Sequence, residues 1–278
     1  FFAAKGLPSL FRLSRRMRRK RPVDDSNDTI ITIKIPFEAN PLICSKISQD
    51  LVKYILYMRQ QIPCPYNDLK SSAEENKNEK EGVRAKKTIS AKKRRLDKLL
   101  ETVDSVLDGL SPALFETRQV VEILFMLGSS IFSPKEVYSL VFSNGGVSSR
   151  SISDRQLSDV SKRLVRGMIT CASPVFDREV KCCRLFTLVR SQNALTYTKL
   201  FSLKTSFKLK LKRAPLVNVF LKTPGSNDFN LRPRQRDASG SKQIQVPDES
   251  NCGPEEDAGN KYLWYLCEAT PKGLKGCA

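Results

Sequence analysis

The chain has 278 residues, of which 40% are hydrophobic and 28% charged, and 48 lysines and arginines against 29 acidic residues give a net charge of +19. That apolar content suffices for one sizeable core or two small ones. The sequence contains no histidine, which excludes an imidazole base, a histidine metal ligand and a Ser-His-Asp relay.

The eight cysteines are scattered and none of them is spaced as C-x-x-C. Without a secretory signal or a small disulfide framework, we expect reduced, mostly buried thiols. Cys182 and Cys183 are the only close pair, and adjacent ligands are unusual for zinc, so we expect no metal and no cofactor. No window approaches the roughly 18 to 20 apolar residues of a membrane span, so we expect a soluble protein without a membrane partner.

The first residue is Phe1, so we expect a fragment or an imperfect gene model. Residues 1–22 carry eight basic residues and no acid. A nuclear localisation cluster, a nucleic-acid-binding arm and an Arg-rich transit peptide all fit this run. Nucleic acid is less favoured because few aromatic side chains accompany the charge. We treat residues 1–28 as a basic disordered N-terminal segment.

The core is expected to begin with a half-buried strand at residues 29–37, where isoleucines alternate with polar side chains and Pro36 marks the end or an edge. From Pro41 the apolar period lengthens to three or four residues. This period predicts an amphipathic helix, stopped by Pro63 and Pro65, with the apolar positions Ile47, Leu51, Tyr54, Ile55, Met58 and Ile62.

Residues 67–88 hold 11 charged residues out of 22 and no aromatic, which predicts a flexible charged loop. A second amphipathic helix follows, with apolar residues from Leu96 to Leu110. The acidic residues on its other side fit a solvated face better than a paired-carboxylate site.

Residues 118–127 are rich in β-branched and aromatic residues and end at Gly128, as a central strand would; a helix continuing from residue 112 is the competing interpretation. Ser133, Pro134 and Glu136 then match a helix-capping box, which predicts a short helix. A third long helix opens near Ser153, with Gln156 as its capping partner and a basic second face that includes Val165.

The remaining sequence predicts strands at 179–189 and 195–203. Residues 207–211 alternate apolar residues with lysines, which predicts a strand with one wet, positive face, and 216–221 is its expected hairpin partner. We expect residues 29–223 to form the core and 224–260 to be a disordered loop.

An apolar strand begins at residue 261 and holds the only tryptophan. A terminal strand this apolar must dock on the core, so we treat residues 261–278 as a docked C-terminal segment. No phosphate-binding glycine loop, nucleophile elbow or acidic calcium loop is present. We therefore expect a protein that works through surfaces and is not an enzyme.

Three blocks of sequence together resemble the Comet family, the binding proteins of the spindle-checkpoint HORMA protein Mad-two. The blocks are LVKYILYMRQQIPCPY at 51–66, LGSSIFSPKEVY at 127–138 and YLWYLCEATPKG at 262–273. The resemblance implies an α+β, HORMA-like fold in which three main helices pack on an antiparallel sheet. It also implies that the C-terminal segment wraps the core as a safety-belt-like strand.

Family members bind the closed conformer of this checkpoint protein by imitating its own dimerisation partner. The resemblance carries that surface onto the end of the first helix and onto the third long helix, at Tyr57, Met58, Arg59, Lys162, Arg163, Leu164, Val165, Arg166 and Met168. The family pattern has Gln at the position of Met58 and Phe at that of Val165, which bears on affinity rather than location. Leu164 and Met168 equally fit a role in the chain's own core.

Comet proteins also act as adaptors that present the closed conformer to a hexameric AAA+ ATPase. The family's F-R-x-K-L stretch resembles residues 207–211 here, which implies that Lys208 and Lys210 face the ATPase; a solvated strand face is the alternative. The resemblance thus implies a non-enzymatic adaptor in spindle assembly checkpoint silencing during mitosis, in the nucleus and cytoplasm and associated with the spindle. The rivals are a basic nucleic-acid-binding protein and an adaptor for a different HORMA protein.

Overall fold

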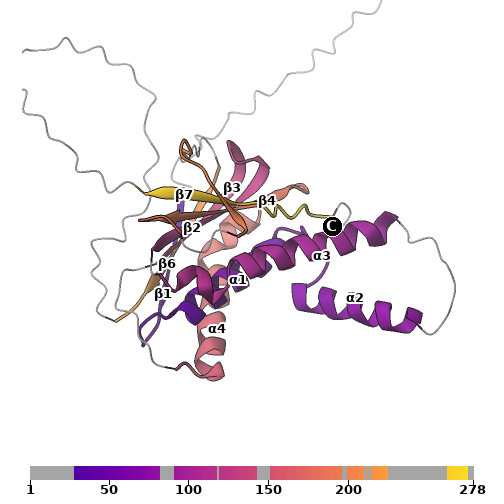
Figure 1. Cartoon of the computed structure of the whole chain (residues 1–278), viewed down its shortest axis with the longest axis horizontal. Helices are drawn as coiled ribbons and strands as arrows, with labels where there is room; N and C mark the ends of the chain where they lie inside the picture. Colours follow the sequence, from indigo (N-terminus) through magenta and orange to yellow (C-terminus); the bar gives the residue numbers. More distant parts are fainter. Residues whose placement is uncertain are drawn as a thin grey trace, which may run out of the picture.

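The computed structural model describes residues 28–81, 91–117, 119–142, 151–195, 199–209, 211, 214–224 and 262–274. Within these residues, helices lie on one side of a single sheet, and helix α2 lies beside α3 away from it (Figure 1). The expected disordered segments, residues 1–28 and 224–260, fall almost entirely outside the described residues.

Seven strands form the sheet in the order β1-β6-β3-β2-β4-β7-β5. Strand β6 pairs in parallel with both β1 and β3, whereas the pairs among β3, β2, β4, β7 and β5 are antiparallel. The expected antiparallel sheet is therefore wrong at this edge. The strands are β1 (Asp28–Lys34), β2 (Val120–Ser130), β3 (Ser133–Phe142), β4 (Arg184–Ser191), β5 (Phe201–Leu203), β6 (Leu216–Lys222) and β7 (Leu263–Cys267).

The helices begin at the capping signals that the sequence provides. Asn40 accepts a hydrogen bond from the backbone N–H of Ile43 at the start of α1, and Pro41 occupies the first turn. Ser153 and Gln156 form a reciprocal capping box at the start of α4. The helices are α1 (Pro41–Met58), α2 (Tyr66–Glu81), α3 (Ala91–Gly109), a 3₁₀ turn η1 (Pro112–Phe115) and α4 (Asp154–Phe176).

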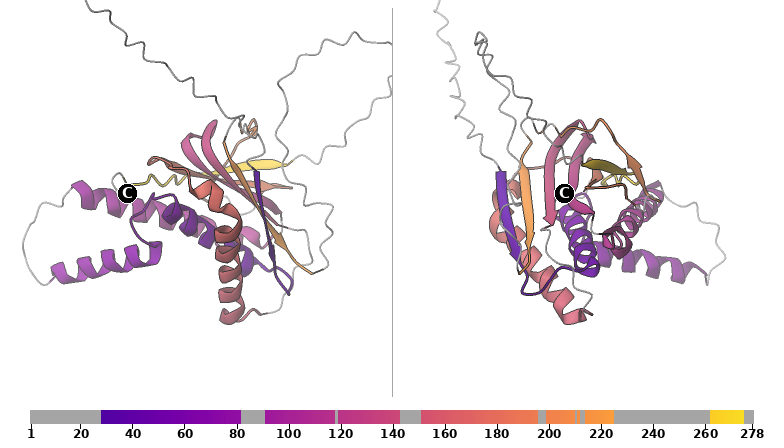
Figure 2. Two further views of the ribbon diagram at one scale, coloured as in Figure 1. Left: turned by 180° about the vertical axis from the view of Figure 1, so that it is seen from behind. Right: turned by 60° about the vertical axis from the view of Figure 1, so that its left-hand side comes forward.

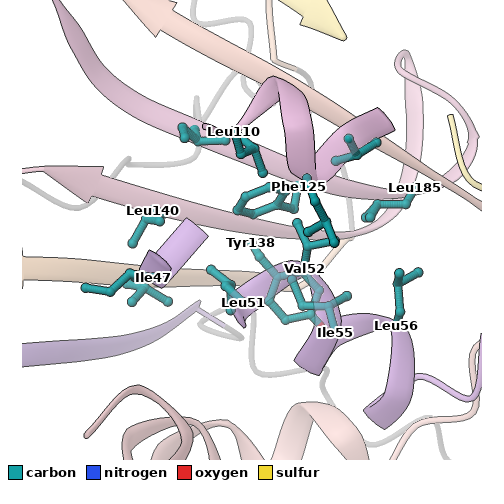
Figure 3. Close-up of a cluster of buried hydrophobic side chains, with 14 of the residues drawn as sticks. Ile47, Leu51, Val52, Ile55, Leu56, Leu110, Phe125, Tyr138, Leu140 and Leu185 are labelled. Carbon is teal, nitrogen blue, oxygen red and sulfur yellow. The ribbon is translucent and has the colours of Figure 1, made fainter. Parts of the chain in front are cut away.

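The main core lies between the helices and the sheet. Figure 3 shows the apolar face of α1, including Leu51 and Ile55, against Phe125 and Leu140 of the central strands, and all four side chains are fully buried. Burying side chains of this size contributes about 1.5–3 kcal/mol each. A second cluster covers the opposite face of the sheet, where Phe207 packs edge-on against Trp264.

Side chains of α1 also donate hydrogen bonds to backbone carbonyl groups at the end of α3. The hydroxyl of Ser45 donates to the carbonyl of Leu110 at 2.6 Å, and the Gln49 amide donates to the carbonyl of Leu107 at 2.9 Å. The last carbonyls of a helix lack partners within the helix. These bonds therefore fix α1 against the end of α3.

Residues 66–81 form helix α2, which corrects the prediction of a charged loop at 67–88; residues 82–90 lie outside the described ones. Tyr66, Leu69 and Ala73 follow a helical period and are buried. The Tyr66 hydroxyl and the Lys70 ammonium both bind Asp104 of α3. The high charge misled the prediction because only one narrow stripe of this helix needs to be apolar.

The prediction of a short helix after Ser133 is wrong, because residues 133–142 form β3 and pair with β2. A capping box contributes only about 1 kcal/mol, whereas Val137, Tyr138 and Leu140 are fully buried in the sheet. Gly128 faces the turn of this hairpin, where a Cβ atom would lie 2.9 Å from the carbonyl of Ser133.

The strand predicted at residues 207–211 is also wrong, although its burial pattern is right. Phe207 and Leu211 are buried and Lys208 is exposed, but residues 207–209 and 211 have no strand pairing. Likewise β6 exists as predicted but pairs in parallel with β1 and β3 rather than in a hairpin. The mixed α+β arrangement as a whole is consistent with a HORMA-like fold.

Candidate functional site: a groove between helices α1 and α4

Helices α1 and α4 cross on the same side of the sheet (Figure 2). Their side chains line a groove of about 670 Å³. One wall comes from α1 and the other from α4, and residues at the start of α2 also line the groove. The lining residues are Lys46, Asp50, Lys53, Tyr54, Tyr57, Pro65, Tyr66, Asn67, Ser158, Ser161, Lys162, Val165, Arg166, Ile169 and Thr170.

Helix α4 forms its wall because it is strongly amphipathic. Its apolar stripe is buried against the core, and Gly167 allows a close approach to β1, since a Cβ atom there would lie 2.9 Å from Ile31. The helix therefore turns its remaining face outward, with Ile169 exposed by 59%. Together with Val165 and Tyr57, which also line the groove, Ile169 gives the groove apolar surface that is open to a partner.

The wall from α1 is aromatic. Tyr57 is exposed by 42%, one turn beyond the half-buried Tyr54. The Tyr54 ring contacts Phe176 of α4 edge-on, with ring centroids 5.9 Å apart. Aromatic side chains offer a large contact area with little flexibility, which suits a protein-binding surface.

The charge in the groove is positive. Asp50 is already engaged, because Lys46 donates to it at 3.0 Å and the Ser161 hydroxyl binds its other oxygen. Lys162 and Arg166 are exposed on the opposite wall. Partial burial lowers the pKa of Lys53, whose ammonium lies 5.6 Å from the centroid of the Tyr66 ring. Because Lys162 and Arg166 are exposed and Asp50 is already paired, the groove favours an incoming carboxylate.

Two contacts hold the walls of the groove together. The bond between Ser161 and Asp50 joins α4 to the middle of α1. Near the end of α1, Arg59 donates to the carbonyl of Phe176 at 3.1 Å and forms an ion pair with Glu136 of β3. Burial raises the pKa of Glu136, while its bonds with Arg59 and Tyr138 act in the opposite direction.

The structure brings together some of the predicted partner-binding residues but not all of them. Tyr57, Lys162, Val165 and Arg166 line the groove, and the half-buried Met58 follows Tyr57 at the helix end. Arg163 is exposed, but it reaches the other way and donates to the carbonyl of Lys34 on β1.

Arg59, Leu164 and Met168 correct the prediction, because none of them reaches the surface. Leu164 and Met168 are fully buried in the main core, and Arg59 is 3% exposed. Of the two roles that the sequence left open for Leu164 and Met168, the structure favours the core. The apolar period of α4, which places both residues in register with Val160 and Ala172, carries that information.

Sequence reasoning missed Lys53, Tyr54 and Ile169 as groove residues. Lys53 belongs to the polar side of the α1 pattern and Tyr54 to its apolar positions, and only the position of α4 reveals that both face a second wall. Of the two lysines predicted to face an ATPase, Lys208 is exposed on the segment that covers the opposite face of the sheet, and Lys210 lies outside the described residues.

The described part of the chain has neither a metal-binding cluster nor a membrane-spanning helix. No group of three or more cysteine or acidic side chains there could hold a metal ion. None of the described helices is long and apolar enough to cross a membrane. Six cysteines in this part are free thiols, while Cys252 and Cys277 lie outside it.

A family model described as "p31comet: Mad1 and Cdc20-bound-Mad2 binding" matches residues 18–193, which is more than half of the chain. The chain belongs to the p31comet family. This confirms the resemblance to Comet proteins, and the whole lining of the groove falls inside the matched range. The family is thus one of binding proteins.

Two mammalian proteins also match. The MAD2L1-binding protein of Homo sapiens is 31% identical over 116 residues, which are 41% of this chain and 42% of that protein. The MAD2L1-binding protein of Mus musculus is 30% identical over 113 residues, 40% of this chain and 41% of that protein. The match thus spans less than half the length of these relatives.

Proposed function

We propose that this p31comet-family chain binds a Mad2-type HORMA protein in its closed conformer, through the groove between α1 and α4. The observation that carries the proposal is that the match to a Mad2-binding family covers every residue of that groove. The groove offers exposed aromatic and aliphatic side chains together with cationic ones, which suits a partner helix with apolar anchors and carboxylates.

We further propose that the chain is an adaptor and not an enzyme. It presents the closed conformer to a hexameric AAA+ ATPase, promotes conversion of that conformer and silences the mitotic spindle checkpoint, in the nucleus and cytoplasm and at the spindle in mitosis. An adaptor needs no chemistry of its own, because differential affinity for one conformer is sufficient to shift a population. Lys208 and Lys210 are the proposed ATPase-facing residues.

The C-terminal segment is proposed to act as a safety-belt-like strand on a HORMA-like core. Strand β7 lies between β4 and β5 in the sheet, and residues 271–274 continue from it toward the end of α1. These contacts support a segment that wraps part of the core.

The test is a calorimetric titration of the chain with the same organism's Mad2 protein, locked in the closed or the open conformer. The closed conformer is expected to bind, and the open conformer to bind at least tenfold more weakly. Val165→Glu should abolish binding. Leu203→Glu is the matched control, because Leu203 is exposed by 47% on edge strand β5 and lines no part of the groove.

A basic nucleic-acid-binding function is the second candidate, favoured by the cationic residues that α4 exposes. It predicts binding to duplex or single strands with a steep dependence on salt. This binding should survive Val165→Glu and decrease when residues 1–22 are removed. Absence of Mad2 binding, together with such a salt dependence, would replace the first proposal by this one.

A further inference from the structure

The segment that follows β7 runs back to the end of helix α1. We call residues 268–274 the C-terminal strap. The backbone N–H of Leu185 donates to the carbonyl of Pro271 at 2.9 Å, and that of Gly273 donates to the carbonyl of Cys183 at 3.0 Å. Lys272 forms an antiparallel bridge with Arg184. The strap is thus held along the start of β4 before it reaches α1.

The strap meets the turn that follows α1 at Gln61, which is 1% exposed. The backbone N–H of Leu274 donates to the Gln61 carbonyl at 2.9 Å. The side-chain oxygen of Gln61 accepts the backbone N–H of Cys183 at 2.9 Å, and its amide donates to the carbonyl of Arg59 at 2.7 Å. One buried side chain therefore joins β4 to the turn that ends α1, directly beneath the strap.

The contact between Gln61 and Gly273 admits no larger residue. A Cβ atom at position 273 would lie 2.3 Å from the side-chain oxygen of Gln61, well inside van der Waals contact. Any side chain there must displace either the strap or Gln61. Because the Gln61 amide holds the Arg59 carbonyl, displacing Gln61 also disturbs the turn. This turn is tight, since Gln60 has a positive φ of 51°.

Arg59, in the same turn, makes the contacts that hold one end of the groove together. Arg59 forms the buried ion pair with Glu136 and donates to the carbonyl of Phe176 at the end of α4. The exposed Tyr57, a wall of the groove, lies two residues earlier. The strap, the end of α1 and the end of α4 therefore share one buried set of hydrogen bonds.

We propose that the docked strap positions the partner-binding end of α1, with Gln61 and Gly273 as positioning residues that transmit its docking to Tyr57 and to the α4 wall. This inference rests on the proposed Mad2 binding at the groove. Neither residue contacts the partner. Release of the strap loosens the turn at 59–61, and the groove then lacks the fixed spacing that a tight complex requires.

The test compares two glycine substitutions in the full chain. Gly273→Ala introduces the clash with Gln61. Gly109→Ala is the matched control, because a Cβ atom there would meet the Phe201 ring at an ordinary 3.4 Å. Gly273→Ala is expected to weaken binding to the locked closed Mad2 protein at least tenfold and to speed hydrogen exchange at the amides of residues 59–61 and Cys183. Gly109→Ala should change neither.

Two further variants separate positioning from general destabilisation. Gln61→Glu keeps the size of the side chain but replaces its donor to the Arg59 carbonyl with an acceptor, so it should weaken binding even when Gly273→Ala fails to fold. Leu211→Ala removes a buried side chain from the second cluster and should lower stability without changing affinity. Wild-type affinity in Gly273→Ala and Gln61→Glu would overturn the inference.

The outcomes also separate the inference from the proposed function. If the wild-type chain binds neither conformer, the proposed function fails, while faster exchange at residues 59–61 in Gly273→Ala still reports the coupling of strap and turn. If the wild type binds, Val165→Glu does not, and Gly273→Ala binds normally with unchanged exchange, only the inference fails.

Discussion

An arginine side chain has opposite surroundings in the groove and in the buried turn that follows α1. In the turn, Arg59 is paired with Glu136 and capped by the carbonyl of Phe176. In the groove, Arg166 is exposed and has no ion pair among the described residues. A buried arginine whose hydrogen bonds are all made within the chain stabilises the fold. An exposed arginine beside apolar residues is available to a partner. Substitutions in the two regions should therefore affect different measurements.

The largest effect is expected in the buried turn. Arg59→Ala leaves Glu136 buried without its partner, which should lower the free energy of unfolding by about 3–5 kcal/mol, as measured by urea denaturation. Replacing both residues together, Arg59→Met with Glu136→Leu, should cost much less because no buried charge remains. Equal losses in the single and double variants would contradict this reading of the pair.

Neighbouring positions on α4 sharpen the contrast. Leu164 is fully buried and Val165 lines the groove. Leu164→Ala should therefore lower the free energy of unfolding by about 2–5 kcal/mol through the cavity it leaves, with affinity for Mad2 unchanged in the folded fraction. Val165→Glu should do the reverse. The contrast would be contradicted if both variants changed only the free energy of unfolding or only the affinity for Mad2.

Within the groove, aromatic area should matter more than single charges. Tyr57→Ala should weaken binding to closed Mad2 by about 1–2 kcal/mol, because it removes a central aromatic anchor, with urea unfolding nearly unchanged. Lys162→Ala, at the rim, should slow association and reduce the salt dependence while changing affinity less. Calorimetric titrations measure the affinities of both variants, and stopped-flow experiments measure their association rates.

The smallest effect concerns the buried thiols. Burial raises the pKa of Cys183 and of Cys267 to about 11, from 9.0 for a free thiol. The folded state then keeps protons that the unfolded state releases between about pH 9 and 11, so stability falls as pH rises through this window, by roughly 1 kcal/mol per thiol at pH 10. Cys183→Ala should reduce the difference in unfolding free energy between pH 8 and pH 10. An unchanged difference would contradict the assignment.

Helical periodicity allowed much of the fold to be predicted from the sequence. It located α1, α3 and α4, and the capping box at Ser153 marked the start of α4 within one residue. It failed where local and distant forces compete. The capping pattern at Ser133 is weaker than the burial that β3 gains beside β2, and strand pairing at residues 207–211 needs a neighbour that the sequence does not reveal.

For the proposed site, the resemblance to the Comet family pointed to the two helices but could not distinguish their faces. Tyr57 and Val165 line the groove, whereas Arg59 and Met168 are buried. Lys53 and Ile169 became candidates only once α1 and α4 were seen to face each other. The contact of Gly273 with Gln61 joins residues 212 positions apart in sequence, and neither residue type signals it.

Photo-crosslinking from single positions tests the central claim most directly, because it reports where the partner lies rather than how tightly it binds. A photoreactive phenylalanine at position 165 is expected to crosslink to the closed Mad2 protein, and the same group at position 203 on β5 is not. A complex that forms but crosslinks from position 203 and not from 165 would contradict the assignment of the groove.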